Sequence, residues 1–239
     1  MKRALVTGAS GGIGAAIARR LAADGHHVIV HANRRRDKAE AIVADILAAG
    51  GSTEAVAFDI TDAAATTTAL EALLAAGPVQ ILVNNAGLHA DAVFPGMAAE
   101  QWHKVMDVNL NGFYNVTQPL TMPMIRTRWG RIVTITSVAG LVGNRGQVNY
   151  AAAKGALHAA SKSLALELAS RGITVNAVAP GIIATDMIEG SFDKAAIERL
   201  VPMKRAGKPE EVADLVAFLA SDRATYITGQ ILSINGGMV

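Results

Sequence analysis

Short apolar runs recur along the chain, separated by longer amphipathic segments rich in alanine. The apolar runs fall at 3–7, 27–31, 53–58, 79–83, 131–136, 173–179 and 230–234. Each is the length of a strand, and the segments between them are the length of helices. Strands that alternate with helices form right-handed crossovers and a parallel sheet. The pattern therefore predicts an α/β fold, with a doubly wound parallel sheet of about seven strands and helices on both faces.

The spacing of turn residues indicates one domain over 1–239. Turn-forming pairs such as Asp24-Gly25 and Gly50-Gly51 mark helix ends. No linker, repeat or low-complexity segment breaks the alternation of strands and helices. One long irregular stretch, 181–208, follows the sixth predicted strand. Doubly wound sheets bind ligands in a crevice at the carboxyl ends of their strands. We therefore expect 181–208 to be a substrate lid over that crevice.

Composition excludes several classes of protein. The 239 residues are half apolar, contain no cysteine and carry a net charge of +2. A disulfide framework and a thiolate metal site are thus impossible, and a general nucleic-acid binder is disfavoured. His27 and His31 would stand roughly 13 Å apart on a strand, so no metal site is expected. The first strand begins almost at Met1 and no apolar run could span a bilayer, which predicts a cytoplasmic protein without membrane segments.

The first strand runs into a glycine-dense turn, Thr7-Gly-Ala-Ser-Gly-Gly-Ile-Gly14, and apolar residues then recur at 13, 17 and 21. Such a strand–turn–helix lets backbone N–H groups and a helix N-terminus approach an anion. The dinucleotide fingerprint G-x-G-x-x-G is not met literally, because its third position is Ile17. The spacing is Thr-Gly-x-x-x-Gly-x-Gly instead. A glycine-rich hairpin without a ligand is the alternative.

Tyr150 and Lys154 stand one helical turn apart, with Ser137 upstream at the end of the fifth predicted strand. A lysine beside the phenol is expected to lower the pKa of Tyr150. Such a tyrosine is a usable general acid for ketone reduction, or a general base for alcohol oxidation. Asn109 sits among apolar residues in a predicted helix, where asparagine is a poor interior residue, and a helix irregularity is expected near Gly112.

The second predicted strand ends in Asn33-Arg34-Arg35-Arg36 rather than in an acidic residue. In this kind of fold an acid at that place holds the ribose 2′-hydroxyl of NAD, and a basic residue suits the 2′-phosphate of NADP. Arg34 or Arg35 is the expected phosphate partner. The alternative is solvated charge at a helix start. Asp59 closes the third strand, and its alternative role of helix capping is better suited to Thr61 or Asp62.

Taken together, these motifs resemble the short-chain dehydrogenase/reductase superfamily, whose domain is of the Rossmann type. The resemblance covers essentially the whole chain and is strongest to the β-ketoacyl-[acyl carrier protein] reductases. Its motifs, in the family's order, are Thr7-Gly8-x-x-x-Gly12-x-Gly14, Asp59, Asn84-Asn85-Ala86-Gly87, Asn109, Ser137, Tyr150-x-x-x-Lys154, Pro180-Gly181 and the C-terminal Thr228-Gly-Gln-Ile-Leu-Ser-Ile-Asn-Gly-Gly-Met238. After the glycine that matches Gly87, the sequence of those reductases is similar to Ile-Thr-Arg-Asp, whereas this chain has Leu-His-Ala-Asp91.

The resemblance implies an NADP(H)-dependent oxidoreductase that reduces a β-ketoacyl (3-oxoacyl) thioester to the 3-hydroxyacyl thioester. It makes Tyr150 the proton donor, Ser137 the partner of the carbonyl oxygen, Lys154 a ligand of the nicotinamide ribose and Asn109 the anchor of a water. Asp59 would accept from the adenine amino group. The cofactor-binding residues it implies are Gly8, Ser10, Gly12, Ile13, Gly14, Asn33, Arg34, Arg35, Asp59, Ile60, Asn85, Ala86, Gly87, Tyr150, Lys154, Pro180, Gly181, Ile183 and Thr185.

The resemblance also implies partners. Arg128 and Arg171 match basic residues that dock acyl carrier protein, and a homotetramer is expected through the helix 149–170 and the C-terminal strand. Alternatives in substrate are a specialised polyketide or polyene pathway, a coenzyme A thioester, and a sugar or polyol. The alternative of another class is a catalytically silent NADP-binding subunit. The sequence leaves acyl chain length and the physiological carrier undetermined.

Overall fold

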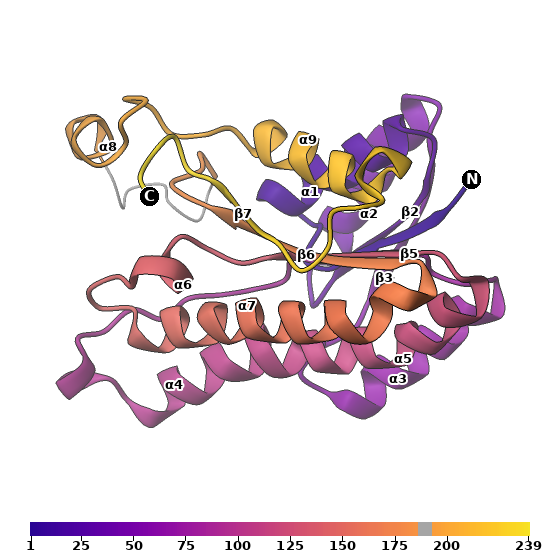
Figure 1. The fold of residues 1–239 in the computed structure, drawn as a ribbon, viewed down its shortest axis with the longest axis horizontal. Helices are drawn as coiled ribbons and strands as arrows, with labels where there is room; N and C mark the ends of the chain where they lie inside the picture. The colour runs from indigo at the N-terminus through magenta and orange to yellow at the C-terminus, as the bar shows by residue number, and fades with distance from the viewer. Residues whose placement is uncertain (186–192) are drawn as a thin grey trace.

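The computed structural model describes residues 1–185 and 193–239 and forms an α/β fold around one parallel sheet (Figure 1). The strands run in the order β3-β2-β1-β4-β5-β6-β7, and every neighbouring pair is parallel. Their bounds are Arg3–Val6 (β1), His27–Ala32 (β2), Ser52–Ala57 (β3), Ile81–Asn84 (β4), Gly130–Ile135 (β5), Ile173–Pro180 (β6) and Ile231–Ile234 (β7). The predicted doubly wound, seven-stranded sheet is confirmed.

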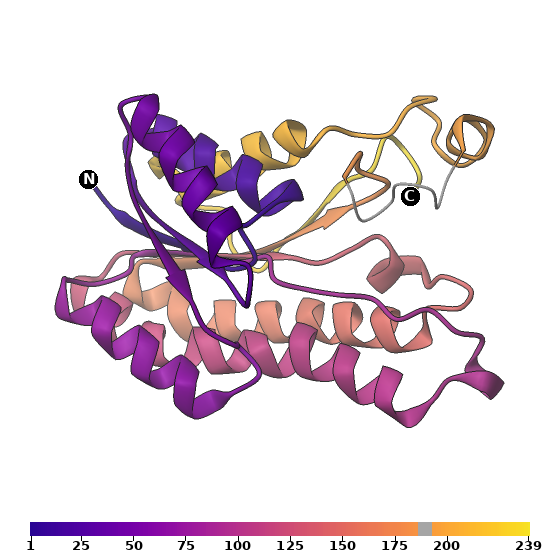
Figure 2. The ribbon, with the colours of Figure 1, turned by 180° about the vertical axis from the view of Figure 1, so that it is seen from behind.

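Helices cover both faces of the sheet. Figures 1 and 2 show α1, α2 and α9 on one side and α3, α4, α5 and α7 on the other. The helices are Gly12–Ala23 (α1), Arg36–Ala48 (α2), Ala63–Ala75 (α3), Ala99–Met106 (α4), Gly112–Thr127 (α5), Ala139–Val142 (α6), Val148–Leu168 (α7), Lys194–Leu200 (α8) and Pro209–Ala220 (α9). Short 3-10 turns lie at Phe94–Gly96 (η1), Ala169–Arg171 (η3) and Asp222–Ala224 (η4), and a π-helical turn at Asp107–Asn111 (η2).

The strands are apolar on both faces, which is why helices must cover each side. In β1, Ala4 and Val6 belong to the core under α1, α2 and α9, whereas Leu5 belongs to the core under α3, α5 and α7. Successive side chains of a strand point to opposite faces, so one short run serves both cores. Alanine-rich α1 packs directly on α9, and an ion pair between Arg20 and Asp214 joins their exposed edges.

Two further sequence expectations are tested by the local structure. The expected irregularity near Gly112 is confirmed as η2, through which α4 continues into α5. Asp62 is the N-cap of α3, and its carboxylate accepts from the Ala65 N–H. Asp62 therefore caps this helix in place of Asp59, as the sequence indicated. No helix in the described part of the chain combines the length and the hydropathy needed to cross a membrane.

The predicted lid, 181–208, falls partly on residues 186–192, which lie outside the described residues. The described parts are 181–185 and 193–208, and the second part contains α8. Ile183 forms a parallel bridge with Gly207, so both ends of the segment are joined beside the end of β6. A closing role for this segment stays a prediction.

Candidate active site

A cleft of about 1110 Å³ opens at the carboxyl ends of the strands, where a doubly wound sheet binds its ligand. Every residue predicted to contact the cofactor lines this cleft, and so do the predicted catalytic residues Ser137, Tyr150 and Lys154. Asn109 lines a small cavity directly beneath it, together with Lys154. The fold therefore gathers the predicted site residues in one place, and their roles in binding and catalysis stay predictions.

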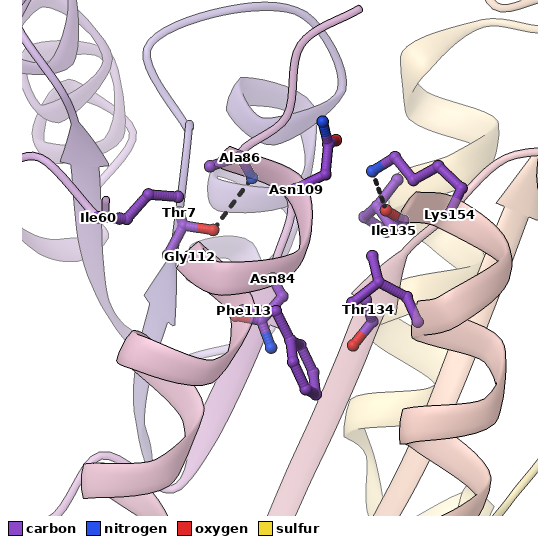
Figure 3. Close-up of a pocket in the computed structure, with 11 residues that line it drawn as sticks. Thr7, Ile60, Asn84, Ala86, Asn109, Gly112, Phe113, Thr134, Ile135 and Lys154 are labelled. Carbon is purple, nitrogen blue, oxygen red and sulfur yellow. Dashed lines mark hydrogen bonds between the residues drawn. The ribbon is translucent and has the colours of Figure 1, made fainter. Parts of the chain in front are cut away.

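The glycine-rich turn after β1 is fixed to the turn after β4. The Thr7 hydroxyl oxygen accepts from the backbone N–H groups of Asn85 and Ala86, each at 3.0 Å. Figure 3 shows the second of these bonds. In return, the Asn85 amide donates to the carbonyl oxygens of Thr7 and Gly8. Gly8 has φ +64°, and a Cβ there would lie 2.8 Å from the Ala86 Cα, so only glycine fits this turn.

The N-terminus of α1 presents open backbone to the cleft. Gly11 is the N-cap, no side chain caps the helix, and a Cβ on Gly11 would meet no atom within 4 Å. The first N–H groups of a helix lack partners within it, and its positive dipole end favours an anion. The turn therefore fits the diphosphate of a dinucleotide, as the sequence predicted.

The basic segment after β2 divides into two kinds of arginine. Arg36 begins α2 and pairs with Glu40, at 2.9 Å between Nε and Oε1. Arg34 and Arg35 are exposed at the cleft and form no ion pair within residues 1–185 and 193–239. Asp59 lies across from them and accepts from both the N–H and the hydroxyl of Thr61, which holds the pKa of its carboxyl below the usual range. Of the three arginines, only Arg34 and Arg35, the predicted phosphate partners, line the cleft in the described structure, and their role stays a prediction.

The end of β5 and the first turns of α7 bring Ser137, Tyr150 and Lys154 together. The Ser137 hydroxyl accepts from the Ala139 N–H at 3.1 Å and also lies close enough to Tyr150 to act on its pKa. Lys154 is buried, and its Nζ donates to the Ile135 carbonyl oxygen at 2.9 Å. The same Nζ lies 5.6 Å from the centre of the Tyr150 ring.

One expectation about this group is wrong. Lys154 was expected to lower the pKa of Tyr150, whereas in the structure burial raises that pKa and the contact with Ser137 opposes the rise only in part. The reason is that both groups leave water: burial also lowers the pKa of Lys154 to about 8. A raised pKa keeps the phenol protonated at neutral pH. In this state Tyr150 has a proton to donate.

The small cavity beneath the cleft is about 10 Å³ and is lined by polar atoms without partners. The Asn109 amide donates to the carbonyl oxygens of Leu88 (2.8 Å) and Val105 (2.9 Å), but its Oδ1 is buried with no hydrogen-bond partner among the described residues. The Thr134 hydroxyl is likewise buried with no hydrogen-bond partner among the described residues. Figure 3 shows Asn109 and Lys154 facing this space from opposite sides. Its size and lining fit one water molecule, which is the role predicted for Asn109.

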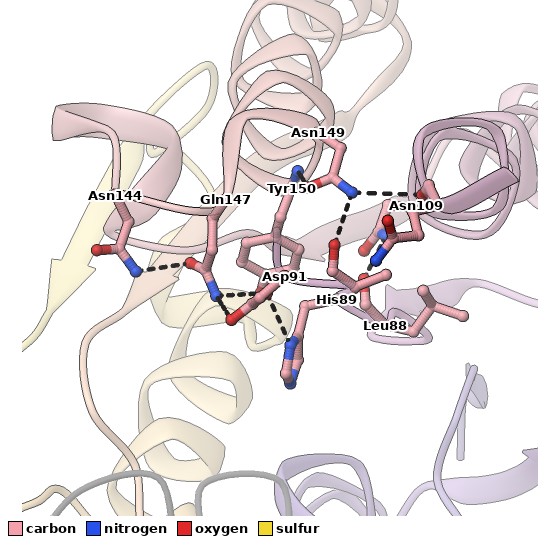
Figure 4. A network of polar contacts seen from close by, with 10 residues as sticks. Leu88, His89, Asp91, Asn109, Asn144, Gln147, Asn149 and Tyr150 are labelled. Carbon is pink, nitrogen blue, oxygen red and sulfur yellow. Dashed lines mark hydrogen bonds and ion pairs between the residues drawn. The ribbon is translucent and has the colours of Figure 1, made fainter. Parts of the chain in front are cut away.

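A polar network forms the rim of the cleft beside Tyr150 (Figure 4). Asp91 accepts from the Gln147 amide at 3.0 Å and lies 3.0 Å from the His89 Nδ1, and Asn149 donates to the Ala90 carbonyl. These bonds join the segment after β4 to the start of α7, and the Asp91 charge adds to the rise in the pKa of Tyr150. The sequence reasoning missed Gln147 and Asn149, whose only signal was their place just before Tyr150.

His31 was considered in the sequence only as a metal ligand, and no role at the site was predicted for it. His31 is 1% exposed, lines the cleft and contacts the glycine-rich turn. Its signal was a polar residue that follows three apolar residues near the end of the strand. Within the described ranges, no three His, Cys, Asp or Glu side chains form a group that could hold a metal ion.

Comparison with known proteins identifies the family of this chain. A family model described as "Enoyl-(Acyl carrier protein) reductase" matches residues 8–239. The chain belongs to the short-chain dehydrogenase/reductase family. Members of this family named 3-oxoacyl-[acyl-carrier-protein] reductase FabG occur in Aggregatibacter actinomycetemcomitans, 47% identical over 98% of both chains, and in Staphylococcus aureus strain Mu50, 45% identical over 99% of this chain and 98% of the relative. A 3-oxoacyl-[acyl-carrier-protein] reductase of Synechocystis is 46% identical over 99% of this chain and 96% of the relative.

Membership of the dehydrogenase/reductase family implies an oxidoreductase that uses a nicotinamide cofactor. The residues of this chain fit such a group. The uncapped N-terminus of α1 suits the diphosphate, and the buried Lys154 beside Tyr150 lies at the far end of the same cleft. Arg34 and Arg35, after β2, line the same cleft.

Proposed function

We propose that this protein is an NADPH-dependent reductase that converts a 3-oxoacyl-[acyl-carrier-protein] to the 3-hydroxyacyl thioester. The observation that carries the proposal is the meeting of Ser137, Tyr150 and Lys154 in one cleft with the glycine-rich turn and the arginines Arg34 and Arg35. The relatives that are 3-oxoacyl-[acyl-carrier-protein] reductases suggest the substrate class. Burial keeps Tyr150 a protonated phenol at neutral pH, and a protonated phenol can donate to a ketone oxygen.

In this mechanism the protein aligns the ketone and manages one proton. The Ser137 hydroxyl donates a hydrogen bond to the ketone oxygen as negative charge develops there. Tyr150 gives its phenolic proton to that oxygen, which becomes the hydroxyl of the product. Lys154, whose Nζ lies 5.6 Å from the centre of the Tyr150 ring, would hold the nicotinamide ribose. Asn109 would hold the water that returns a proton to this pair. When bound, NADPH would supply the hydride to the ketone carbon.

The test of the activity is NADPH oxidation with acetoacetyl groups linked to acyl carrier protein, coenzyme A and N-acetylcysteamine. We expect turnover on all three and the highest kcat/KM on the carrier protein. Binding of NADPH without turnover on any of them would contradict the proposal and support a catalytically silent subunit. Oxidation of sugars or polyols with NADP⁺, faster than reduction of the thioesters, would support the dehydrogenase alternative.

The preference for NADPH rests on the arginines after β2. Arg34 and Arg35 have no carboxylate partner in the described structure, whereas Arg36 is paired with Glu40. A charged hydrogen bond contributes about 1.5–3 kcal/mol, which corresponds to roughly tenfold to over a hundredfold in kcat/KM for NADPH over NADH. Arg34→Ala with Arg35→Ala should remove most of this preference, and Arg36→Ala, the matched control, should keep it. Equal kcat/KM for the two cofactors in the wild type would contradict the assignment.

Docking of the carrier protein is proposed at Arg128 and Arg171. Both are exposed, and they lie close together, because the Arg128 guanidinium is 3.3 Å from the carbonyl oxygen of Ser170. Two cations side by side suit an acidic partner. Their competing role is the stabilisation of helix C-termini, since Arg128 is the C-cap of α5 and Arg171 ends η3 after α7.

A homotetramer is proposed from the apolar side chains that α5 and α7 expose on one side of the sheet. Tyr114 and Met122 of α5 are 64% and 52% exposed, and Leu166 of α7 is 84% exposed. Large exposed apolar side chains are favoured at subunit interfaces, where association removes them from water. Light scattering at micromolar concentration should give four times the chain mass. A monomer under these conditions would contradict the proposal.

The described parts of 181–208 are proposed to cover the substrate. Leu200 of α8 lines the cleft and is 44% exposed, and Val142 of α6, another residue that lines the cleft, is 62% exposed. Both provide apolar surface for an acyl chain. We expect Leu200→Ser to raise KM for longer acyl chains more than for acetoacetyl groups. The cytoplasmic location is kept as a proposal that cell fractionation tests.

A further inference from the structure

His31 is the last but one residue of β2, and both nitrogens of its ring are bonded to backbone. The Gly8 N–H lies 3.1 Å from Nδ1, and Nε2 lies 2.9 Å from the carbonyl oxygen of Phe58. The ring also packs on the Phe58 ring, with 4.3 Å between centres. Its own carbonyl oxygen accepts from the Ala9 N–H at 2.8 Å. Backbone and side chain of His31 therefore hold two successive residues of the glycine-rich turn.

These partners fix the state of the ring. A backbone N–H can only donate, so Nδ1 must be the acceptor for Gly8. A carbonyl oxygen can only accept, so Nε2 must carry the hydrogen. Only the neutral ring with the proton on Nε2 meets both conditions. Burial also favours the neutral ring, because it lowers the pKa of His31 to about 4.

The three strand ends that His31 joins carry the residues expected to hold the two ends of the cofactor. Gly8 begins the turn that leads to the open N-terminus of α1. Phe58 directly precedes Asp59, and Asn33 and Arg34 follow His31 itself. The Gly8 N–H is thus held by a side chain that also binds the end of β3. A shift of this ring would move the turn relative to Asp59 and Arg34.

We propose that His31 is a positioning residue, which sets the glycine-rich turn at the place where it can bind the diphosphate of the cofactor. The inference rests on the proposed function, because it assumes that the cleft binds a dinucleotide. His31 need not touch the cofactor, and it acts through the Gly8 N–H.

Two substitutions separate the bonds of the ring. In His31→Asn the amide oxygen has the reach of Nδ1 and keeps an acceptor for Gly8, but Phe58 loses its donor. In His31→Gln the amide nitrogen has the reach of Nε2 and keeps the donor to Phe58, but the Gly8 N–H loses its acceptor. Each variant gives up one hydrogen bond to backbone, so a similar loss of thermal stability is expected from both.

The measurement is the Kd for NADPH by fluorescence titration, with the Tm of each protein measured without NADPH. We expect Kd to rise about tenfold in His31→Gln and to stay within about threefold of wild type in His31→Asn. Equal Kd in the two variants, or a rise that follows Tm instead of the Gly8 bond, would overturn the inference. Failure of the wild type to bind NADPH would instead overturn the proposed function.

A measurement on the wild type decides the matter even if the variants do not fold. Nitrogen NMR of the histidine rings should show His31 neutral, with its proton on Nε2, and its Nδ1 resonance should move when NADPH is added. A proton on Nδ1, or an Nδ1 resonance that NADPH leaves in place, would show that His31 does not hold the turn for the cofactor.

Discussion

Lys154→Met should make the protein more stable and abolish its activity. Lys154 is 3% exposed, and its ammonium has the Ile135 carbonyl oxygen as its hydrogen-bond partner. Burial lowers the pKa of the ammonium from 10.5 to about 8, so the charged form is less favourable in the folded chain than in the unfolded chain. Methionine has a similar length and no charge, so it would avoid this cost.

The magnitude follows from linkage. A fall from 10.5 to about 8 means that the charged lysine destabilises the folded state by about 3 kcal/mol at pH 7. Loss of the bond to Ile135 offsets about 1–2 kcal/mol of the gain, because a carbonyl oxygen is left without a donor. Lys154→Met should therefore raise the free energy of unfolding by about 1–2 kcal/mol, and Tm by about 2–4 °C for each kcal/mol in a chain of this size.

The sign of the pH dependence gives an independent check. Because the folded pKa lies below the unfolded value, stability should rise as pH climbs through about 8 towards 10.5. The wild type should gain about 1 kcal/mol between pH 7 and pH 9 that Lys154→Met does not gain.

The assay is urea unfolding at both pH values, together with NADPH oxidation. Lys162→Met is the matched control, because Lys162 is exposed on the same helix, and it should change neither stability nor turnover appreciably. A Lys154→Met protein less stable than the wild type at pH 7, with the same pH dependence as the wild type, would refute the reasoning. The expected result would mean that the enzyme keeps a destabilising lysine because the chemistry needs it.

Further predictions concern the donor, the docking surface and the buried histidine. Tyr150→Phe should lower kcat by about 10²–10⁴-fold and leave NADPH binding nearly unchanged, so a variant with more than a tenth of wild-type kcat would disprove the acid assignment. Arg128→Glu with Arg171→Glu should raise KM for the carrier-linked substrate in a salt-dependent way and spare the N-acetylcysteamine thioester; parallel loss on both would leave only a helix-capping role. Since burial lowers the pKa of His31 from 6.5 to about 4, its contribution is complete above pH 6.5 and is lost as pH falls towards 4. Between pH 7 and pH 5 the wild type should lose about 2 kcal/mol more than His31→Asn, and equal losses would contradict this.

The local patterns of the sequence were enough to predict the frame of the molecule. Apolar runs spaced by helix-length segments predicted all seven strands and the parallel sheet, because burial on both faces demands continuous apolar strands. The order of glycine turn, Ser137, Tyr150 and Lys154 indicated the family, which the comparisons confirm. The capping role of Asp62 and the irregular helix before Gly112 were also predictable, since each depends on residues only a few positions apart.

Properties that depend on segments far apart in the chain were decided by the tertiary structure. The sequence predicted a lowered pKa for Tyr150 from its neighbour Lys154, but burial raises it, and burial is set by the packing of α7 beneath the cleft. The ion pair with Glu40 distinguishes Arg36 from Arg34 and Arg35. The position of Gly8 is set by hydrogen bonds between the two turns and the side chains of Thr7, Asn85 and His31. Spacing along a sequence gives the neighbours on one element, whereas dielectric surroundings and hydrogen-bond partners come from other elements, and only folding brings these together.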